Sequence, residues 1–194
     1  MSHTPAVSAP RIAVRRGGVI EVGARRVPEE TALALVFNGT THAVMMGTPA
    51  DLEDFAVGFA LSEEIVASAD EIESVEAIEM PEGVELRMWI RNDRQADLFG
   101  RRRQMAGPTG CGLCGIESLA AAMRPLPSVG EGVAVPVGAI PAAVAALAGA
   151  QALGAETRAV HAAGFWHPER GLVAAREDVG RHNALDKVIG AVMR

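Results

Sequence analysis

The two cysteines of this chain, Cys111 and Cys114, lie together in one stretch of loop-forming residues. Half of residues 106–115 are glycine or proline, so the backbone here can adopt conformations that are closed to most residues. Residues 116–123 are rich in strong helix formers and predict a helix. Cys114 then lies near a helix N-terminus, whose partial positive charge favours thiolate over thiol. We therefore expect nucleophilic sulfur chemistry at this loop.

A second group of reactive side chains lies close to the end of the sequence. It comprises Asp178, Arg181, His182, Asn183, Asp186 and Lys187, with Val179, Leu185, Val188 and Ile189 as the expected buried stripe. If a helix begins near Gly180, its free amide groups and Arg181 form an anion site. His182 and Asp186 are spaced to share one face of that helix. The plainer alternative is a surface helix with a satisfied histidine.

Composition excludes several classes of function. The net charge of −6 argues against general nucleic-acid binding, which uses basic surfaces. No apolar run reaches the roughly 20 residues that a membrane helix needs, and the first residues contain no apolar core of a signal peptide. Two cysteines in such a chain indicate a reactive or metal-binding pair rather than a disulfide scaffold. We expect a cytoplasmic protein that binds neither membranes nor nucleic acid.

The first half of the chain predicts strands around one helix. Residues 1–10 contain little to bury and predict a disordered tail. Residues 19–22, 31–37 and 41–46 are expected strands, the last two joined by a hairpin turn at Asn38-Gly39. Thr48 is the expected N-cap of the helix, with Pro49 in its first turn. The apolar positions of this helix repeat at helical spacing: Leu52, Phe55, Ala56, Phe59 and Ala60.

The second half mixes strands and helices as well. Residues 74–80 and 84–91 predict a strand pair, and residues 157–166 and 171–175 two more strands. Residues 137–153, which are mostly alanine and other small apolar residues, predict one helix. The fold class is therefore α/β or α+β. We expect an N-terminal α+β part over residues 11–105 and a second part over residues 106–194.

Several segments resemble one known family. Cys111-Gly-Leu-Cys114-Gly115, residues 178–190 (DVGRHNALDKVIG) and residues 48–62 (TPADLEDFAVGFALS) resemble the FdhD family, the formate dehydrogenase accessory sulfurtransferases. Residues 157–165, which include His161, look like the strand that precedes the family's basic motif. Order and spacing match from about Glu30 onward. Family members continue beyond the Gly190 motif, whereas this sequence ends at Arg194.

The resemblance implies a function and a set of residues. Such proteins take sulfur from a cysteine desulfurase as a cysteine persulfide and pass it to the molybdenum cofactor, Mo-bis(molybdopterin guanine dinucleotide), of formate dehydrogenase. It also implies a homodimer and a cytidine-deaminase-like three-layer domain with a smaller, β-rich N-terminal part. Cys111 corresponds to the persulfide carrier and Cys114 to its companion. The positions expected to contact the cofactor are His161, Asp178, Gly180, Arg181, His182 and Asn183.

Three alternatives stay open at this stage. A zinc site could use Cys111, Cys114 and a histidine such as His161 or His182, although no His-x-Glu motif is present. A thiol–disulfide protein would fit the Cys-x-x-Cys spacing but has no thioredoxin-like βαβ setting. A non-enzymatic scaffold that holds the cofactor during assembly is the third alternative.

Overall fold

The computed structural model describes residues 4–91, 128, 130–132 and 134–194. In this part of the chain the elements are β1 (Ala6–Val14), β2 (Ile20–Pro28), β3 (Thr31–Phe37), β4 (Thr40–Gly47), α1 (Leu52–Ser62), η1 (Ala69–Glu71), β5 (Ile72–Met80), β6 (Gly83–Ile90), α4 (Ala139–Gly149), α5 (Ala152–Thr157), β7 (His161–His167), β8 (Gly171–Asp178) and α6 (Arg181–Met193). The mixed α/β class expected from the sequence is confirmed. The cysteine loop, residues 106–115, lies outside the described residues.

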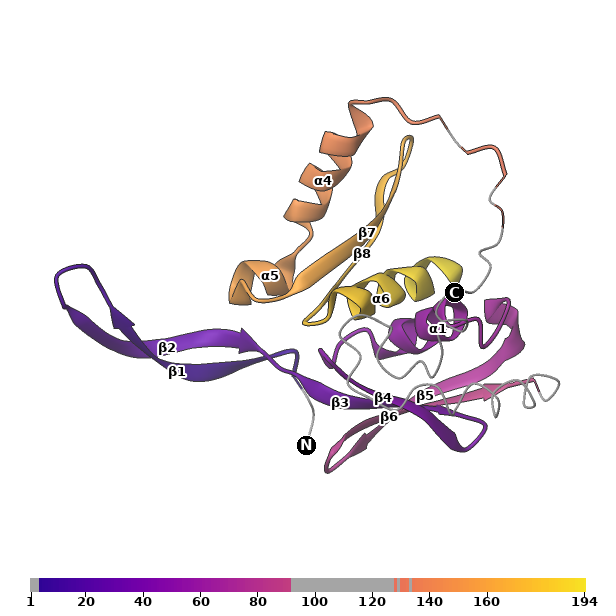
Figure 1. The fold of residues 1–194 in the computed structure, drawn as a ribbon, viewed down its shortest axis with the longest axis horizontal. Coiled ribbons are helices and arrows are strands. Elements are labelled where there is room, and N and C mark those ends of the chain that lie inside the picture. The colour runs from indigo at the N-terminus through magenta and orange to yellow at the C-terminus, as the bar shows by residue number, and fades with distance from the viewer. Residues whose placement is uncertain (1–3, 92–127, 129, 133) are drawn as a thin grey trace, which may run out of the picture.

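The described elements form layers around one four-stranded sheet. The sheet has the order β4-β3-β6-β5, with β3 and β6 parallel at its centre. Helix α1 lies on this sheet, α6 packs on α1, and the hairpin of β7 and β8 packs on α6 (Figure 1). Helix α4 contacts the far side of that hairpin. Helix α1 is therefore covered on two sides, which explains why every residue from Asp54 to Ala60 is buried.

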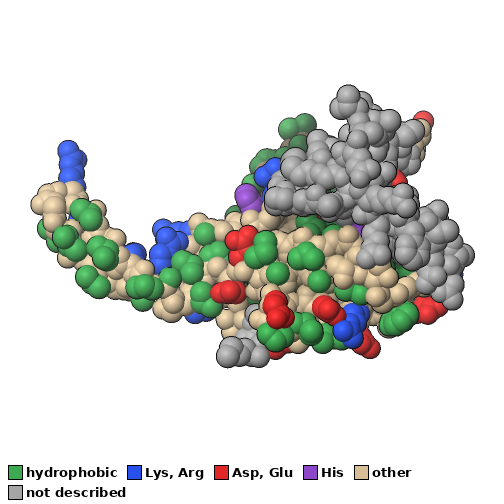
Figure 2. Space-filling view, turned by 60° about the horizontal axis from the view of Figure 1, so that its bottom comes forward, with side chains coloured by type: hydrophobic (Ala, Val, Ile, Leu, Met, Phe, Trp, Pro, Cys, Tyr) green, Lys and Arg blue, Asp and Glu red, His purple; other side chains and the backbone are tan. Residues whose placement is uncertain are grey.

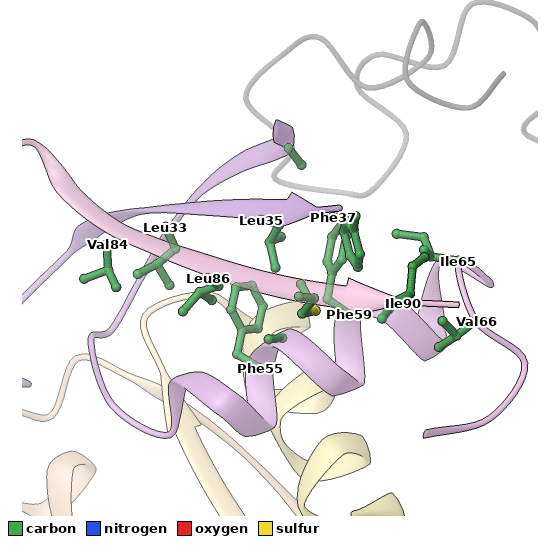
Figure 3. Packing of buried hydrophobic residues seen from close by; sticks show 14 residues of the cluster. Leu33, Leu35, Phe37, Phe55, Phe59, Ile65, Val66, Val84, Leu86 and Ile90 are labelled. Carbon is green, nitrogen blue, oxygen red and sulfur yellow. The ribbon is translucent and has the colours of Figure 1, made fainter. Parts of the chain in front are cut away.

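The main core lies between the sheet and α1 (Figure 3). The strands contribute alternate residues, as expected for a sheet with one covered face: Leu33, Leu35 and Phe37 from β3, and Val84, Leu86, Met88 and Ile90 from β6. Phe55 and Phe59 of α1 point toward these strands. Phe55, Ala56, Phe59 and Ala60 are buried and Leu52 is partly buried, so the predicted apolar face of α1 is confirmed.

The turn between β3 and β4 is the predicted hairpin. Asn38 and Gly39 have φ angles of 47° and 75°, in the left-handed region that Asn-Gly pairs adopt in tight hairpins. The Asn38 side chain also accepts from the amide of Ile90 at 2.8 Å and donates to its carbonyl at 3.0 Å. The same residue therefore makes the turn and joins it to β6.

Residues 6–10 are not a disordered tail. They belong to β1, which pairs antiparallel with β2 over nine residues and forms a projecting hairpin, here called the arm (residues 6–28; Figure 1). The expected strand at 19–22 is the first part of the longer β2. Composition misled the prediction, because the arm buries few side chains and is held by its ladder of backbone hydrogen bonds. One face of its outer part is apolar, with Ile12, Val14, Ile20 and Val22 each at least two-thirds exposed.

The helix predicted over residues 137–153 is two helices. Helix α4 ends at Gly149, and α5 begins at Ala152. The carboxylate of Glu177 on β8 accepts from the amides of Leu153 at 2.8 Å and Gly154 at 2.7 Å. These two amides lie in the first turn of α5, where intrahelical acceptors are lacking, so a distant carboxylate fixes a new helix start. Thr157 ends α5, and the strand expected from residue 157 begins at His161.

Helices α1 and α6 approach each other at two glycines. A Cβ on Gly58 would overlap the carbonyl of Asp186, and a Cβ on Gly190 would overlap the carbonyl of Asp54. Both obstacles are backbone atoms of the facing helix, so they cannot rotate away as side-chain atoms can. The contact between the two halves of the chain therefore requires glycine at both positions.

Among the described helices, none combines the length and the apolar character required to cross a bilayer.

The glycine contact predicts a specific loss of stability. Gly58→Ala should lower the free energy of unfolding by about 3 kcal/mol, because the added methyl group forces α1 and α6 apart. Gly149→Ala is the matched control, since nothing lies within 4 Å of a Cβ at Gly149 and alanine favours helices. Urea unfolding followed by circular dichroism measures both. Equal stability of Gly58→Ala and the unchanged protein would contradict the close approach.

Candidate functional site

Asp178 is the centre of a buried polar network at the start of α6. It is the last residue of β8, and its side chain is fully buried. Its Oδ2 accepts from the amide of Thr48 at 2.9 Å and lies 2.7 Å from Nζ of Lys187. Its Oδ1 accepts from the amide of Gly180 at 2.7 Å and from Nδ2 of Asn183 at 3.0 Å. Four donors around one carboxylate compensate for the water that the ion loses on burial.

Lys187 is the only lysine in the chain, and it is fully buried. Its ammonium group has three N–H donors and three acceptors: Oδ2 of Asp178, the carbonyl of Thr48 at 2.9 Å, and the carbonyl of Glu177 at 3.5 Å. The pair of Asp178 and Lys187 therefore joins β8 and α6 to the loop between β4 and α1. Sequence reasoning listed Lys187 in the polar cluster but gave it no role.

Thr48 belongs to this network and does not cap α1. The helix begins at Leu52, and Asp51 precedes it with a left-handed φ of 51° and no side-chain cap. The Thr48 hydroxyl instead accepts from the amide of Val179 at 3.1 Å. The amide, hydroxyl and carbonyl of Thr48 thus all form hydrogen bonds with residues between Asp178 and Lys187. The N-cap prediction was wrong because a local motif could not reveal this distant partner.

Two glycines leave room for the network. At Gly47 a Cβ would stand 2.8 Å from Cδ1 of Leu33 and 3.0 Å from Nδ2 of Asn183. At Gly180 it would stand 3.0 Å from the same Asn183 nitrogen. Asn183 fills the space between them and also donates to the carbonyl of Met46 at 2.9 Å. The chain is therefore closely packed around Asn183, on both sides of its amide.

The start of α6 lies at the predicted place. The helix begins at Arg181, and Gly180 precedes it in the N-cap position without a side-chain cap. Arg181 and His182, its first two residues, are exposed. His161, the first residue of β7, is exposed and is the register partner of Asp178. The structure thus brings His161, Asp178, Gly180 and Asn183 together, with Arg181 and His182 at the adjoining helix start.

The six predicted cofactor residues fall into two groups. Asp178 and Asn183 are almost completely buried and hold the turn before α6 through the contacts described above. His161, Arg181 and His182 are exposed, and Gly180 is partly exposed at the helix start. Contact of any of the six with a cofactor stays a prediction. The expected buried stripe is wrong in part, because only Val188 of its four residues is buried, Val179 and Ile189 are half-buried, and Leu185 is 51% exposed. The buried residues of α6 are Asn183, Ala184, Lys187, Val188 and Gly190.

Asp186 pairs across the helix contact rather than with His182. Its Oδ1 accepts from the hydroxyl of Ser62, at the end of α1, at 2.6 Å. Burial raises the pKa of Asp186 from 3.8 to about 6; the Ser62 hydrogen bond opposes this rise, and the nearby Glu63 carboxylate adds to it. Asp186 is therefore an acid that titrates close to neutral pH at the α1–α6 contact.

A second ionic cluster holds the start of α1. The Asp54 carboxylate lies 2.7 Å from Nη2 of Arg176 on β8 and 2.7 Å from Nη1 of Arg194. Arg194 also pairs with Glu53 at 2.6 Å. Glu53 and Asp54 lie in the first turn of α1, as expected for the helix dipole. Asp54 has the further role of joining α1 to β8 and α6, so the two halves of the chain contact each other at both ends of α1.

The chain is similar to known proteins over most of its length. The model of the FdhD/NarQ family matches residues 28–194. The sulfur carrier protein FdhD of Agrobacterium fabrum is 53% identical over 180 residues, which cover 92% of this chain and 66% of that protein. The protein of the same name from Brucella abortus is 52% identical, with 94% and 68% covered.

A solved structure matches as well. A formate dehydrogenase accessory protein from Desulfotalea psychrophila superimposes with a TM-score of 0.66 at 25% identity, covering 97% of this chain and 66% of that one. The fold is therefore that of a formate dehydrogenase accessory protein. The chain belongs to the FdhD/NarQ family. It spans about two-thirds of the length of the curated relatives it matches.

Removal of the Lys187 charge should be strongly destabilising. Lys187→Met leaves Asp178 as a buried carboxylate without its cation, and we expect the free energy of unfolding to fall by about 3–5 kcal/mol. The double variant Asp178→Asn/Lys187→Met removes both charges and should lose less than the single variant. Urea unfolding measures the difference.

If Lys187→Met fails to fold, chemical labelling of the unchanged protein tests the burial of Lys187 instead. An amine-reactive reagent should leave Lys187 unmodified in the native protein and modify it in urea. Because the chain has one lysine, peptide mass spectrometry reads this side chain without interference from others. Rapid native labelling of Lys187 would contradict the buried ion pair.

The raised pKa of Asp186 predicts that the stability of the protein depends on pH. Since its pKa is higher in the folded protein than in the unfolded one, the folded state holds an extra proton between about pH 4 and pH 6. Stability should therefore fall as the pH rises through this window. Asp186→Asn keeps an acceptor for Ser62 and removes the titration, so it should be more stable than the unchanged protein at pH 7.5, by about 2 kcal/mol at most.

Urea unfolding at pH 4.5 and pH 7.5 measures the Asp186 effect. The difference between the two pH values should shrink in Asp186→Asn. Glu169→Gln, in the exposed turn between β7 and β8, serves as the control and should leave the difference unchanged. An unchanged pH difference in Asp186→Asn would show that Asp186 titrates alike in both states.

Proposed function

We propose that this chain is a sulfurtransferase of formate dehydrogenase maturation. It receives sulfur from a cysteine desulfurase as a persulfide on Cys111, with Cys114 as its companion, and passes it to Mo-bis(molybdopterin guanine dinucleotide), which is its substrate. The observation that carries the proposal is the family match over residues 28–194, which includes both cysteines. The names of the relatives support the two coarse parts of it, since they are sulfur carrier proteins and a formate dehydrogenase accessory protein.

The first step of the proposed reaction balances without an oxidant. The Cys111 thiolate attacks the outer sulfur of the donor's persulfide, a new S–S bond forms on Cys111, and the donor cysteine leaves as thiolate. Such a nucleophile must be ionised and accessible. The glycines on both sides of Cys111 and the predicted helix after Cys114 support both conditions.

We propose that the anionic substrate is held at the start of α6. A helix N-terminus without a side-chain cap offers amide donors, and Arg181 adds a guanidinium that suits phosphate. His182 and His161 are exposed beside it and complete the proposed contact surface with Gly180. Asp178 and Asn183 act from the interior in this proposal, because their side chains fix the turn that sets the direction of the helix. The protein would work in the cytoplasm as a homodimer.

The decisive experiment is a mass measurement. Incubation with a cysteine desulfurase and cysteine should add one sulfur mass to the peptide that contains Cys111, and dithiothreitol should remove it. Cys111→Ser should abolish the addition, whereas the matched variant Cys114→Ser should retain it. The absence of a mass shift in the unchanged protein, with the desulfurase active, would overturn the proposal.

The same samples separate the alternative functions. Zinc bound in a one-to-one ratio and lost in Cys114→Ser would favour the metal site. A Cys111–Cys114 disulfide that forms reversibly, without any persulfide, would favour a redox protein. Binding of the cofactor without sulfur on either cysteine would favour the assembly scaffold.

A further inference from the structure

The base of the arm meets α5 around a hollow rich in arginine. Its volume is about 430 Å³, and its walls include Arg11, Arg25, Arg26, Glu156, Thr157 and Arg158. Small-molecule sites in proteins have volumes of roughly 300–1,000 Å³. Four guanidinium groups against one carboxylate make the hollow strongly positive, in a chain whose net charge is −6.

Two of the four arginines, Arg25 and Arg26, make side-chain hydrogen bonds that join the arm to α5. Arg25 donates from Nη2 to the carbonyl of Thr157 at 2.9 Å, which joins β2 to the end of α5. Arg26 donates from Nε to the Glu156 carboxylate at 2.6 Å and from Nη2 to the carbonyl of Ala6 at 2.8 Å. The single carboxylate of the hollow is therefore already paired. These contacts join the arm to α5 at the walls of the hollow.

The other two arginines have donors to spare. Within the part of the chain that the structure describes, Arg11 and Arg158 make no side-chain hydrogen bond or ion pair, although both line the hollow. The strand register pairs Arg11 with Gly23 and Ala9 with Arg25, so Arg11 and Arg25 are diagonal neighbours on one face of the arm. Gly23 has no side chain, and nothing lies within 4 Å of a Cβ at that position. The space beside Arg11 is therefore open.

The charge pattern of the arm agrees with that of the hollow. Residues 4–28 contain five arginines and one glutamate, so the arm is positive while the rest of the chain is strongly negative. Figure 2 shows Lys and Arg side chains at the tip and at the base of the arm, with hydrophobic side chains between them. Like charges so close together repel, and an anion between them relieves that repulsion.

We propose that this hollow binds a small polyanion of the diphosphate class, either inorganic pyrophosphate or the diphosphate group of a nucleotide. Guanidinium groups bind phosphate oxygens through paired, charge-assisted hydrogen bonds, and those of Arg11 and Arg158 spend none of their donors on the described residues. A single monovalent ion would leave most of the positive charge and most of the volume unmatched. The site goes beyond the proposed sulfur transfer, since neither cysteine takes part in it.

Titration calorimetry with inorganic pyrophosphate at low ionic strength tests the proposal. In the Arg181→Gln background, which removes the guanidinium of the proposed site at the start of α6, the protein should bind one equivalent, with an affinity that falls as salt is added. Arg11→Gln and Arg158→Gln should each weaken binding about tenfold or more, and the double variant should show none. Neither side chain holds the arm in place, so the circular dichroism spectrum should not change.

Two control variants keep the result interpretable. Arg170→Gln, in the turn between β7 and β8, removes an exposed charge elsewhere and should leave the affinity unchanged within about twofold. Arg181→Gln should also leave pyrophosphate binding in place, which separates this hollow from the start of α6. Equal weakening by Arg170→Gln, or loss of binding only in Arg181→Gln, would overturn the proposal, as would unchanged affinity in the Arg11 and Arg158 variants.

The same titration with adenosine diphosphate identifies the source of the diphosphate. If adenosine diphosphate binds more tightly than pyrophosphate, and its binding still depends on Arg11 and Arg158, the hollow holds a nucleotide. Equal affinity means that the diphosphate alone is recognised. Both outcomes support the site, and neither depends on persulfide formation at Cys111.

Discussion

The buried ion pair between Asp178 and Lys187 is the interaction on which the rest of the structure depends. Two charges removed from water are costly unless each is surrounded by partners. Here the carboxylate has four donors and the ammonium three acceptors, which come from Thr48 and from residues 177–187, about 130 positions later in the chain. The pair is therefore satisfied only when β4, β8 and α6 are all in place. Such a network favours a single arrangement over similar ones, which hydrophobic packing alone specifies less sharply.

The glycines at the helix contact follow from the same constraint. Lys187 reaches Thr48 and Asp178 only if α6 lies close to α1, and Gly58 and Gly190 allow that distance. The close approach in turn removes Asp186 from water, which is why its pKa rises. The start of α6 is thus fixed by contacts on its buried side, while Arg181 and His182 remain exposed. The anion site that we propose at this helix start would therefore need little rearrangement on binding.

The sequence predicted those features that depend on residues close together in the chain. The Asn38-Gly39 turn, the apolar face of α1 and the start of α6 after Gly180 can all be read from short stretches of sequence. The predictions were wrong where a residue's partner lies far away in the sequence. Thr48 was predicted to cap α1 because the neighbouring sequence does not show its actual partners, Asp178 and Val179, which lie about 130 positions later. The break between α4 and α5 depends on Glu177, and the arm on a strand ladder that composition does not reveal. Lys187 was the missed site residue; a lone lysine four residues after Asn183 was the available signal.

Glu177 connects the segment before α6 to the helix α5 that borders the arginine hollow. Its carbonyl accepts from Lys187, and its carboxylate holds the first amides of α5. The other end of α5 provides Thr157, whose carbonyl accepts from Arg25 of the arm. A continuous set of contacts therefore runs from the ion pair, through a helix of six residues, to the wall of the arginine hollow. Both ends of this short helix are therefore held by charged side chains from other elements. Helix α5 is thus the direct contact between the arm and the segment before α6, by a route that does not include the four-stranded sheet.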